Sequence, residues 1–325
     1  MDPLQSFLVA VKAVLPFLVY LGLGYLAVAV HIADRAFMNR MNKFIFTLIF
    51  PFMTFNSVYG ASREGMPSAT LLIFSAVGIL ALEALLLLIV PRIIKENPRR
   101  GVVIQAIFRS NFALYGIPMT LSLFPDGGSV AGILLLEVVS IFNITSVIIQ
   151  ELFNSENGGR VNIRALPGKL VRNPLLQGCV VGLLFFAFGW QLPEHLEKPV
   201  AALGNSATPL AMITLGGTLS FSALRKNRRL LSGVLGVRLV LLPIVSLLLA
   251  YAIGLRGVEL FLVLMIAGTP IATSSYPMAA NMGGDGELAG QLVFVSTVVS
   301  LATIYCLLGI LSGTDPFFCR DFSSP

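Results

Sequence analysis

The sequence predicts an all-α polytopic membrane protein, in which ten transmembrane helices form a 5+5 inverted repeat and helices 4 and 9 are broken. Three observations carry this prediction. Of the 325 residues, 56% are apolar and only 12% are charged, whereas a soluble domain has roughly 25% charged residues. The apolar residues gather in ten runs, each long enough, at about 20 residues, to cross a bilayer as a helix. The longest polar connection, residues 154–169, leaves five runs on each side.

The scarcity of charge excludes a soluble globular enzyme and a disordered chain. Cys179, Cys306 and Cys319 are too few and too far apart for a secreted disulfide scaffold. The first run has neither a basic leading segment nor a small-residue cleavage site, so we do not interpret it as a signal peptide. The runs do not alternate every second residue, as the strands of a membrane β-barrel would.

The predicted spans are separated by clusters of Gly, Pro and charged residues. In the fourth and ninth spans, polar residues, Gly and Pro interrupt the apolar run near its middle, which predicts broken helices. The ten spans cover residues 7–30, 37–59, 67–90, 101–124, 130–153, 170–190, 196–221, 230–254, 258–282 and 288–311.

The basic residues predict the orientation, because cytoplasmic connections carry an excess of Lys and Arg. Fifteen of the 22 basic residues lie in or directly beside odd-numbered connections. We therefore expect these connections on the cytoplasmic side of the cell membrane, with both termini non-cytoplasmic. This sorting accounts for the net charge of +6, and no soluble segment is long enough to build a basic surface for nucleic acid. The fifteen are Arg35, Arg40, Lys43, Arg92, Lys95, Arg99, Arg100, Arg160, Arg164, Lys169, Arg172, Arg225, Lys226, Arg228 and Arg229.

Residual symmetry supports two related halves, residues 1–153 and 170–325, joined by the short cytoplasmic connection 154–169. The pairs Pro118-Met119 and Pro277-Met278 lie 159 positions apart, as do Asp126-Gly127 and Asp285-Gly286. An odd number of spans in each half inserts the second half upside down, which is the arrangement of inverted-repeat transporters.

The breaks in spans four and nine predict a binding site. Proline removes a backbone donor and clashes with the preceding turn, so it interrupts a helix. The half-helix that begins after a break has unpaired N–H groups and a positive dipole end, which favour binding of an anion. An ordinary proline kink is the alternative for either span alone. The candidate crossover residues are Pro118, Pro270 and Pro277.

Several motifs resemble the auxin efflux carrier family, which includes plant PIN-type carriers and bacterial malate-permease-like members. They are Asn111-x₆-Pro118 in the fourth span, Pro51-Phe52-Met53-Thr54-Phe55 in the second and Arg238-x₄-Pro243 in the eighth. The resemblance implies that spans 1, 2, 6 and 7 form a scaffold and spans 3–5 and 8–10 a transport domain. It also implies crossing helices 4 and 9, an elevator-type motion and a homodimer joined through scaffold helices.

Four ionisable residues lie well inside predicted spans: Glu83, Arg109, Glu137 and Arg238. A charge at the centre of a membrane helix costs at least about 2.5–3.5 kcal/mol on insertion scales, so each needs a partner or a wet cavity. A structural salt bridge between Glu83 and an arginine is one hypothesis. The other is that two arginines against one glutamate leave a surplus positive charge that attracts an organic anion. Glu137 and Glu83 are candidates for proton coupling, with a purely structural role as the alternative.

Asn111 carries both donors and an acceptor, so it can hold a carboxylate without burying a charge. We expect it to bind substrate, although it could instead satisfy backbone groups freed by the break. Tyr276 is a further candidate to line the cavity. Helix packing is the alternative for the hydroxyl-bearing candidates and for Tyr115. The candidate substrate-binding residues are Asn111, Thr54, Tyr115, Thr273, Ser274, Ser275, Arg109 and Arg238.

The sequence therefore predicts a secondary active or potential-driven carrier of a small organic anion, such as a carboxylate or dicarboxylate, embedded in the lipid bilayer. No catalytic residue, metal site or cofactor is predicted, and His31 and His195 lie in connections on opposite faces. A cation or proton antiporter of the same architecture is one alternative, but it would need acidic residues in the breaks. A non-transporting anion sensor is the other. A membrane-embedded enzyme would require a clustered catalytic set that the sequence lacks.

Overall fold

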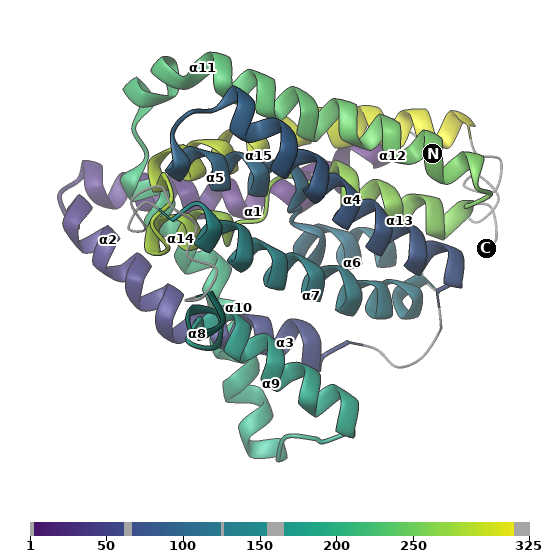
Figure 1. The fold of residues 1–325 in the computed structure, drawn as a ribbon, viewed down its shortest axis with the longest axis horizontal. Coiled ribbons are helices and arrows are strands. Elements are labelled where there is room, and N and C mark those ends of the chain that lie inside the picture. The colour runs from purple at the N-terminus through teal and green to yellow at the C-terminus, as the bar shows by residue number, and fades with distance from the viewer. Residues whose placement is uncertain (1–2, 62–66, 125–126, 155–165, 315–325) are drawn as a thin grey trace.

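The computed structural model describes residues 3–61, 67–124, 127–154 and 166–314, and its elements there are helices (Figure 1). Arg63, Asp126, Arg160 and Arg164, with most of the connection 154–169, lie outside the described residues. The elements are α1 (Pro3–Ala29), α2 (Arg35–Phe44), η1 (Ile45–Ile49), α3 (Phe50–Tyr59), α4 (Ala69–Ile93), α5 (Asn97–Phe108), α6 (Phe112–Leu123), α7 (Gly128–Leu152), α8 (Leu166–Val171), α9 (Pro174–Phe188), α10 (Glu194–Thr218), α11 (Phe221–Gly236), η4 (Val237–Leu241), α12 (Leu242–Ala252), α13 (Gly257–Gly268), α14 (Ser275–Asn281) and α15 (Gly286–Thr314).

Four helical stretches are long and apolar enough to cross a membrane: Ala69–Ile93, Val130–Leu152, Phe221–Ala252 and Gly286–Leu311. Shorter apolar helices, such as Pro174–Phe188, accompany them. These findings confirm the prediction of an all-helical, multi-pass membrane protein.

Glycines let one group of helices pack with their backbones close together. A Cβ atom at Gly178 of α9 would overlap the carbonyl of Pro51 and the hydroxyl of Thr54 in α3. A Cβ atom at Gly216 of α10 would overlap the carbonyl of Leu21 in α1. Small residues permit such approaches between membrane helices. In Figure 1, α3 and α9 lie together at the lower side of the molecule, away from α4, α12 and α13.

Two π-helical turns each precede a proline. Pro51 follows η1, and Pro243 follows η4. A proline offers no N–H and crowds the carbonyl four residues earlier, and the wider π-turn accommodates that loss at a local cost. The second of these turns carries Arg238 into the protein interior, where the side chain is fully buried.

Helices α4 and α7 are joined by two hydroxyl–carboxyl hydrogen bonds. Ser75 donates to Glu137 at 3.2 Å, and Thr145 donates to Glu83 at 2.6 Å. In both pairs the residue of α7 lies 62 positions after its partner in α4. The two helices therefore run in the same direction.

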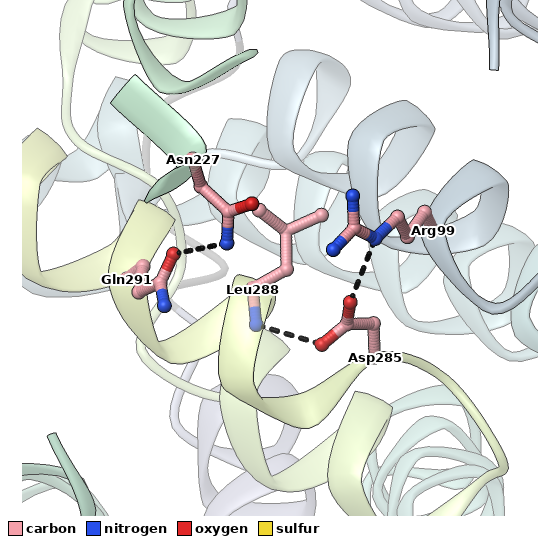
Figure 2. Close-up of polar contacts among 5 residues, drawn as sticks. All are labelled: Arg99, Asn227, Asp285, Leu288 and Gln291. Carbon is pink, nitrogen blue, oxygen red and sulfur yellow. Dashed lines mark hydrogen bonds and ion pairs between the residues drawn. The ribbon is translucent and has the colours of Figure 1, made fainter. Parts of the chain in front are cut away.

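Helices α2, α5 and α11 all begin at one end of the molecule, on the left in Figure 1. At this end, Figure 2 shows Arg99 of α5 paired with Asp285, whose second oxygen accepts the backbone N–H of Leu288 and caps α15. The distances are 3.0 and 2.9 Å. Asn227 of α11 donates to Gln291 of α15 at 2.8 Å, so polar contacts tie α5 and α11 to the same helix.

Candidate functional site

The fourth and ninth predicted spans are each interrupted. Helix α5 ends at Phe108 and α6 begins at Phe112, whereas α13 ends at Gly268 and α14 begins at Ser275. Arg109 and Thr269, which follow the two helix ends, both have extended backbones. The chain therefore offers unpaired backbone groups at both breaks, and these groups must find partners inside the protein.

The two breaks satisfy part of this need by bonding to each other. The N–H of Asn111 donates to the carbonyl of Pro270 at 2.8 Å, and the N–H of Ala272 donates to the carbonyl of Arg109 at 3.3 Å. Between these bonds, Ser110 and Ile271 form an isolated antiparallel bridge.

Of the three candidate crossover prolines, only Pro270 lies in this bridge region. Pro118 lies inside α6. Pro277 lies in the first turn of α14, where a missing N–H leaves no helical bond unmade.

A small cavity of about 70 Å³ adjoins the paired breaks. It brings together five of the predicted substrate-binding residues, Thr54, Arg109, Asn111, Thr273 and Ser274. Four further polar residues line it that are not among the predicted site residues: Ser57, Ser110, Asn143 and Thr208. Ser110 lies between two selected residues in the break, and Thr208 precedes the Pro209 of span seven; both positions are signals that could have identified them.

Arg109 is the charged group of this cavity. Its guanidinium is 3% exposed and donates to Oδ1 of Asn143 at 2.8 Å and to the sulfur of Met278 at 3.5 Å. Both acceptors are neutral, and among the described residues it pairs with no carboxylate. A buried charge without a counter-charge is costly, so a bound anion would stabilise this arrangement.

Several polar groups beside Arg109 have no hydrogen-bond partner within the described part of the chain. The hydroxyl of Ser110 is buried and unpartnered. The carboxamide of Asn111 and the hydroxyls of Thr273 and Ser274 also make no protein hydrogen bond there, although Asn111 and Ser274 are each 5% exposed. Buried polar groups normally have partners, so these groups are free to bind a ligand or water.

Thr54 differs from them, because its hydroxyl lies 3.0 Å from the carbonyl of Leu175 and near two carbonyls of its own helix. It therefore helps join α3 to α9. Tyr115 and Ser275 are buried and do not line the cavity. Tyr115 stacks on Phe17 with ring centroids 5.3 Å apart.

The hydroxyl group of Tyr276 makes a 2.9 Å hydrogen bond with that of Thr218. Tyr276 lines a second, larger cavity of about 500 Å³ between α2, α10, α14 and α15, together with Arg35, Asn281 and Glu287.

Arg238 does not line the small cavity either. It donates to the carbonyls of Ile107, Ile266 and Thr269 at 3.1, 3.2 and 2.9 Å. Glu83 forms no ion pair with either buried arginine in the described residues, and its carboxyl accepts a hydrogen bond from Thr145. The Glu83–arginine salt bridge hypothesis is therefore wrong for this structure, and Glu137 lies with Glu83 in the contact between α4 and α7.

Known proteins resemble the chain along nearly its whole length. A family model described as "Membrane transport protein" matches residues 9–308. An "Uncharacterized transporter" of Methanothermobacter thermautotrophicus is 26% identical over 302 residues, which cover 92% of this chain and 97% of that protein. A "Putative malonate transporter" of Rhizobium meliloti is 22% identical over 312 residues, covering 93% and 96%. "Auxin efflux carrier component 1" of Arabidopsis thaliana is 26% identical over 151 residues, covering 44% of this chain and 24% of that protein.

Proposed function

The chain belongs to the membrane transport protein family, and from this premise we propose that it carries a small organic anion across the cell membrane. The family match confirms the resemblance to auxin efflux carriers, and the names of the relatives indicate a transporter rather than an enzyme. The observation that carries the choice of an anion is Arg109, a buried guanidinium that contacts only neutral acceptors among the described residues.

The substrate class follows from the groups around Arg109. One positive charge, the hydroxyl of Ser110 and the amide of Asn111 can together bind one carboxylate, with Thr273 and Ser274 available for a second polar end. A cavity of about 70 Å³ favours a small acid. We propose a carboxylate or dicarboxylate of about the size of malonate, a substrate class that the name of one relative supports.

We propose ten spans in a 5+5 inverted repeat, with halves at 1–153 and 170–325. The bond from Asn111 to Pro270 supports the repeat, because these residues are separated by the same 159 positions as the repeated sequence pairs. Tyr115, Ser275 and Arg238 do not line the small cavity. We propose that these three residues support the site from outside it.

We propose an elevator-type motion between a scaffold (α1, α2, α3, α9 and α10) and a transport domain built from the remaining spans. Two observations support this division. The glycines at which a Cβ would overlap a backbone carbonyl of another helix lie within the scaffold, as at Gly178 and Gly216. The cavity of about 500 Å³ lies between scaffold helices α2 and α10 and transport helices α14 and α15, where it could pass substrate.

The orientation and assembly are part of the same proposal. The basic starts of α2, α5 and α11 lie at one end of the molecule (Figure 1), which supports a cytoplasmic location for that end and non-cytoplasmic termini. A homodimer through the scaffold helices is expected from the family resemblance.

A cation or proton antiporter is less well supported, because residues 109–111 and 269–274 contain no Asp or Glu. If proton coupling occurs, we propose Glu137 and Glu83 as its carriers. A sensor would bind the same anion as the proposed carrier but would show no uptake.

The test is uptake of radiolabelled malonate, malate and larger acids into proteoliposomes, with Asn111→Ala and Arg109→Gln as site variants. Asn205→Ala is the matched control, because Asn205 is exposed on α10 and lines neither cavity. We expect uptake by the wild type and the control, and a loss of at least tenfold in both site variants. Binding without uptake would favour a sensor, and currents driven by cations without any carboxylate would favour an antiporter.

A further inference from the structure

Arg238 lies where two interrupted helices end. Its Nη1 donates to the carbonyl of Ile107 in the last turn of α5, at 3.1 Å. Its Nη2 donates to the carbonyls of Ile266 and Thr269 at the end of α13, at 3.2 and 2.9 Å. The side chain is fully buried and pairs with no acidic residue in the described part of the chain. Its contacts are therefore with the negative ends of two helix dipoles.

The carbonyls at these helix ends need partners, since the last turn of a helix leaves its carbonyls unbonded and membrane depth offers no water. Groups of the protein donate hydrogen bonds to several of the carbonyls near the breaks. The hydroxyl of Thr269 donates to the carbonyl of Met265 at 2.9 Å. The backbone N–H groups of Asn111 and Ala272 take those of Pro270 and Arg109. Arg238 donates to three more carbonyls, and among these donors it is the one that carries a positive charge.

In sodium-coupled carriers with broken helices, unwound carbonyls and half-helix C-terminal ends coordinate the coupling Na⁺. Here a guanidinium occupies the equivalent chemical environment, and its planar fork of donors suits several carbonyls at once. We propose that Arg238 is a built-in cation that takes the place of a coupling Na⁺. The paired breaks then stay assembled without sodium, and binding of the anion is sodium-independent.

The local sequence explains why the side chain reaches this position. Arg238 lies in the π-helical turn Val237–Leu241 that precedes Pro243, so the turn that accommodates the proline also carries the arginine. A cavity of about 210 Å³, lined by Phe108, Leu242 and Ala267 among others, adjoins Arg238. A small cation has room to enter once the side chain is removed.

The two buried arginines thereby have different roles. Arg109 donates to side chains and lines the substrate cavity. Arg238 donates to three backbone carbonyls and lines a different cavity. It is a positioning residue, which acts on the substrate through the backbone of both breaks. The sodium independence of anion binding rests on the proposed function, whereas the cation-like role of Arg238 in the helix ends does not.

The experiment measures the melting temperature and malonate binding of purified protein in choline chloride, NaCl and guanidinium chloride, the last at low millimolar concentration. For the wild type we expect the same melting temperature and the same Kd in choline and in sodium. For Arg238→Ala we expect a lower melting temperature and at least tenfold weaker binding in choline, with recovery of both in sodium or guanidinium. Arg238→Lys should keep most of the wild-type stability, because it retains a buried cation.

Arg109→Ala is the matched control, since its partners are an amide oxygen and a thioether rather than carbonyls at helix ends; sodium should not restore its binding. A wild type that binds malonate only in sodium would overturn the proposal, as would an Arg238→Ala protein that neither cation stabilises. If the wild type binds no carboxylate at all, the proposed function fails, and the melting temperatures still decide the role of Arg238. If Arg238→Ala does not fold, Arg238→Lys and the sodium titration of the wild type decide it.

Discussion

The backbone N–H of Asn111 donates to the carbonyl of Pro270 at 2.8 Å, and these residues are 159 positions apart. The same separation relates Pro118-Met119 to Pro277-Met278. In the proposed repeat these two residues occupy equivalent positions, and equivalent positions can bond directly only where the repeat axis passes between them. The small cavity beside Arg109 lies at this point, so both proposed halves contribute to the candidate site.

The first prediction concerns the buried charge of Arg109. Replacement by glutamine should weaken malonate binding at least tenfold, because a charge-assisted hydrogen bond to a buried group contributes about 1.5–3 kcal/mol. The same change should raise the melting temperature of the ligand-free protein, since it removes a buried cation that has only neutral partners. Calorimetry measures the change in malonate affinity, and thermal unfolding of the same preparation measures the change in melting temperature. Weaker binding accompanied by a lower melting temperature would show that Arg109 is mainly structural.

The second prediction separates free hydroxyls from bonded ones. Ser110→Ala should weaken binding without destabilising the protein, because the Ser110 hydroxyl has no partner in the described residues. Thr54→Val should do the opposite, leaving Kd within about twofold but costing about 1 kcal/mol of stability, because its hydroxyl bonds to the carbonyl of Leu175. Denaturant unfolding and binding titrations measure both. Equal effects of the two changes on Kd would contradict this assignment.

The contrast between these two residues also marks how far sequence can predict the site. The polar, Gly- and Pro-containing segments predicted where the helices break, because their composition is incompatible with a continuous membrane helix. Composition does not state which hydroxyl is already bonded across to another helix, so Thr54 and Ser110 could not be ranked. The sequence places Arg109 and Arg238 well inside predicted spans and does not distinguish between them. Their opposite surroundings depend on the π-turn at residues 237–241 and on the approach of α5 to α13, which no local pattern encodes.

The third prediction tests close helix packing with two glycines of α1. Gly24→Ala should destabilise the protein by about 1–3 kcal/mol, as overpacking does, because a Cβ there would overlap the carbonyl of Ile213 in α10. Gly22→Ala is the control two residues away, where a Cβ meets nothing within 4 Å. It should be neutral or stabilising by up to about 1 kcal/mol, since alanine favours helix more than glycine does. Similar melting temperatures for the two variants would contradict the packing of α1 on α10.

The last prediction concerns the hydrogen bond between Thr218 of α10 and Tyr276 of α14, which are 2.9 Å apart at their oxygens. In the proposed division, α10 belongs to the scaffold and α14 to the transport domain, so this bond must break whenever the domains slide past each other. Tyr276→Phe should therefore raise the maximal uptake rate several-fold. KM should change less, because Tyr276 lies outside the binding cavity beside Arg109 and lines only the larger cavity that we propose as the passage. Thr218→Val should have the same effect, and the double variant should add nothing further, as expected for two partners in one interaction. Additive effects of the two changes would mean that each residue acts through other contacts, and a raised KM in both would mean that the pair contacts the bound substrate directly.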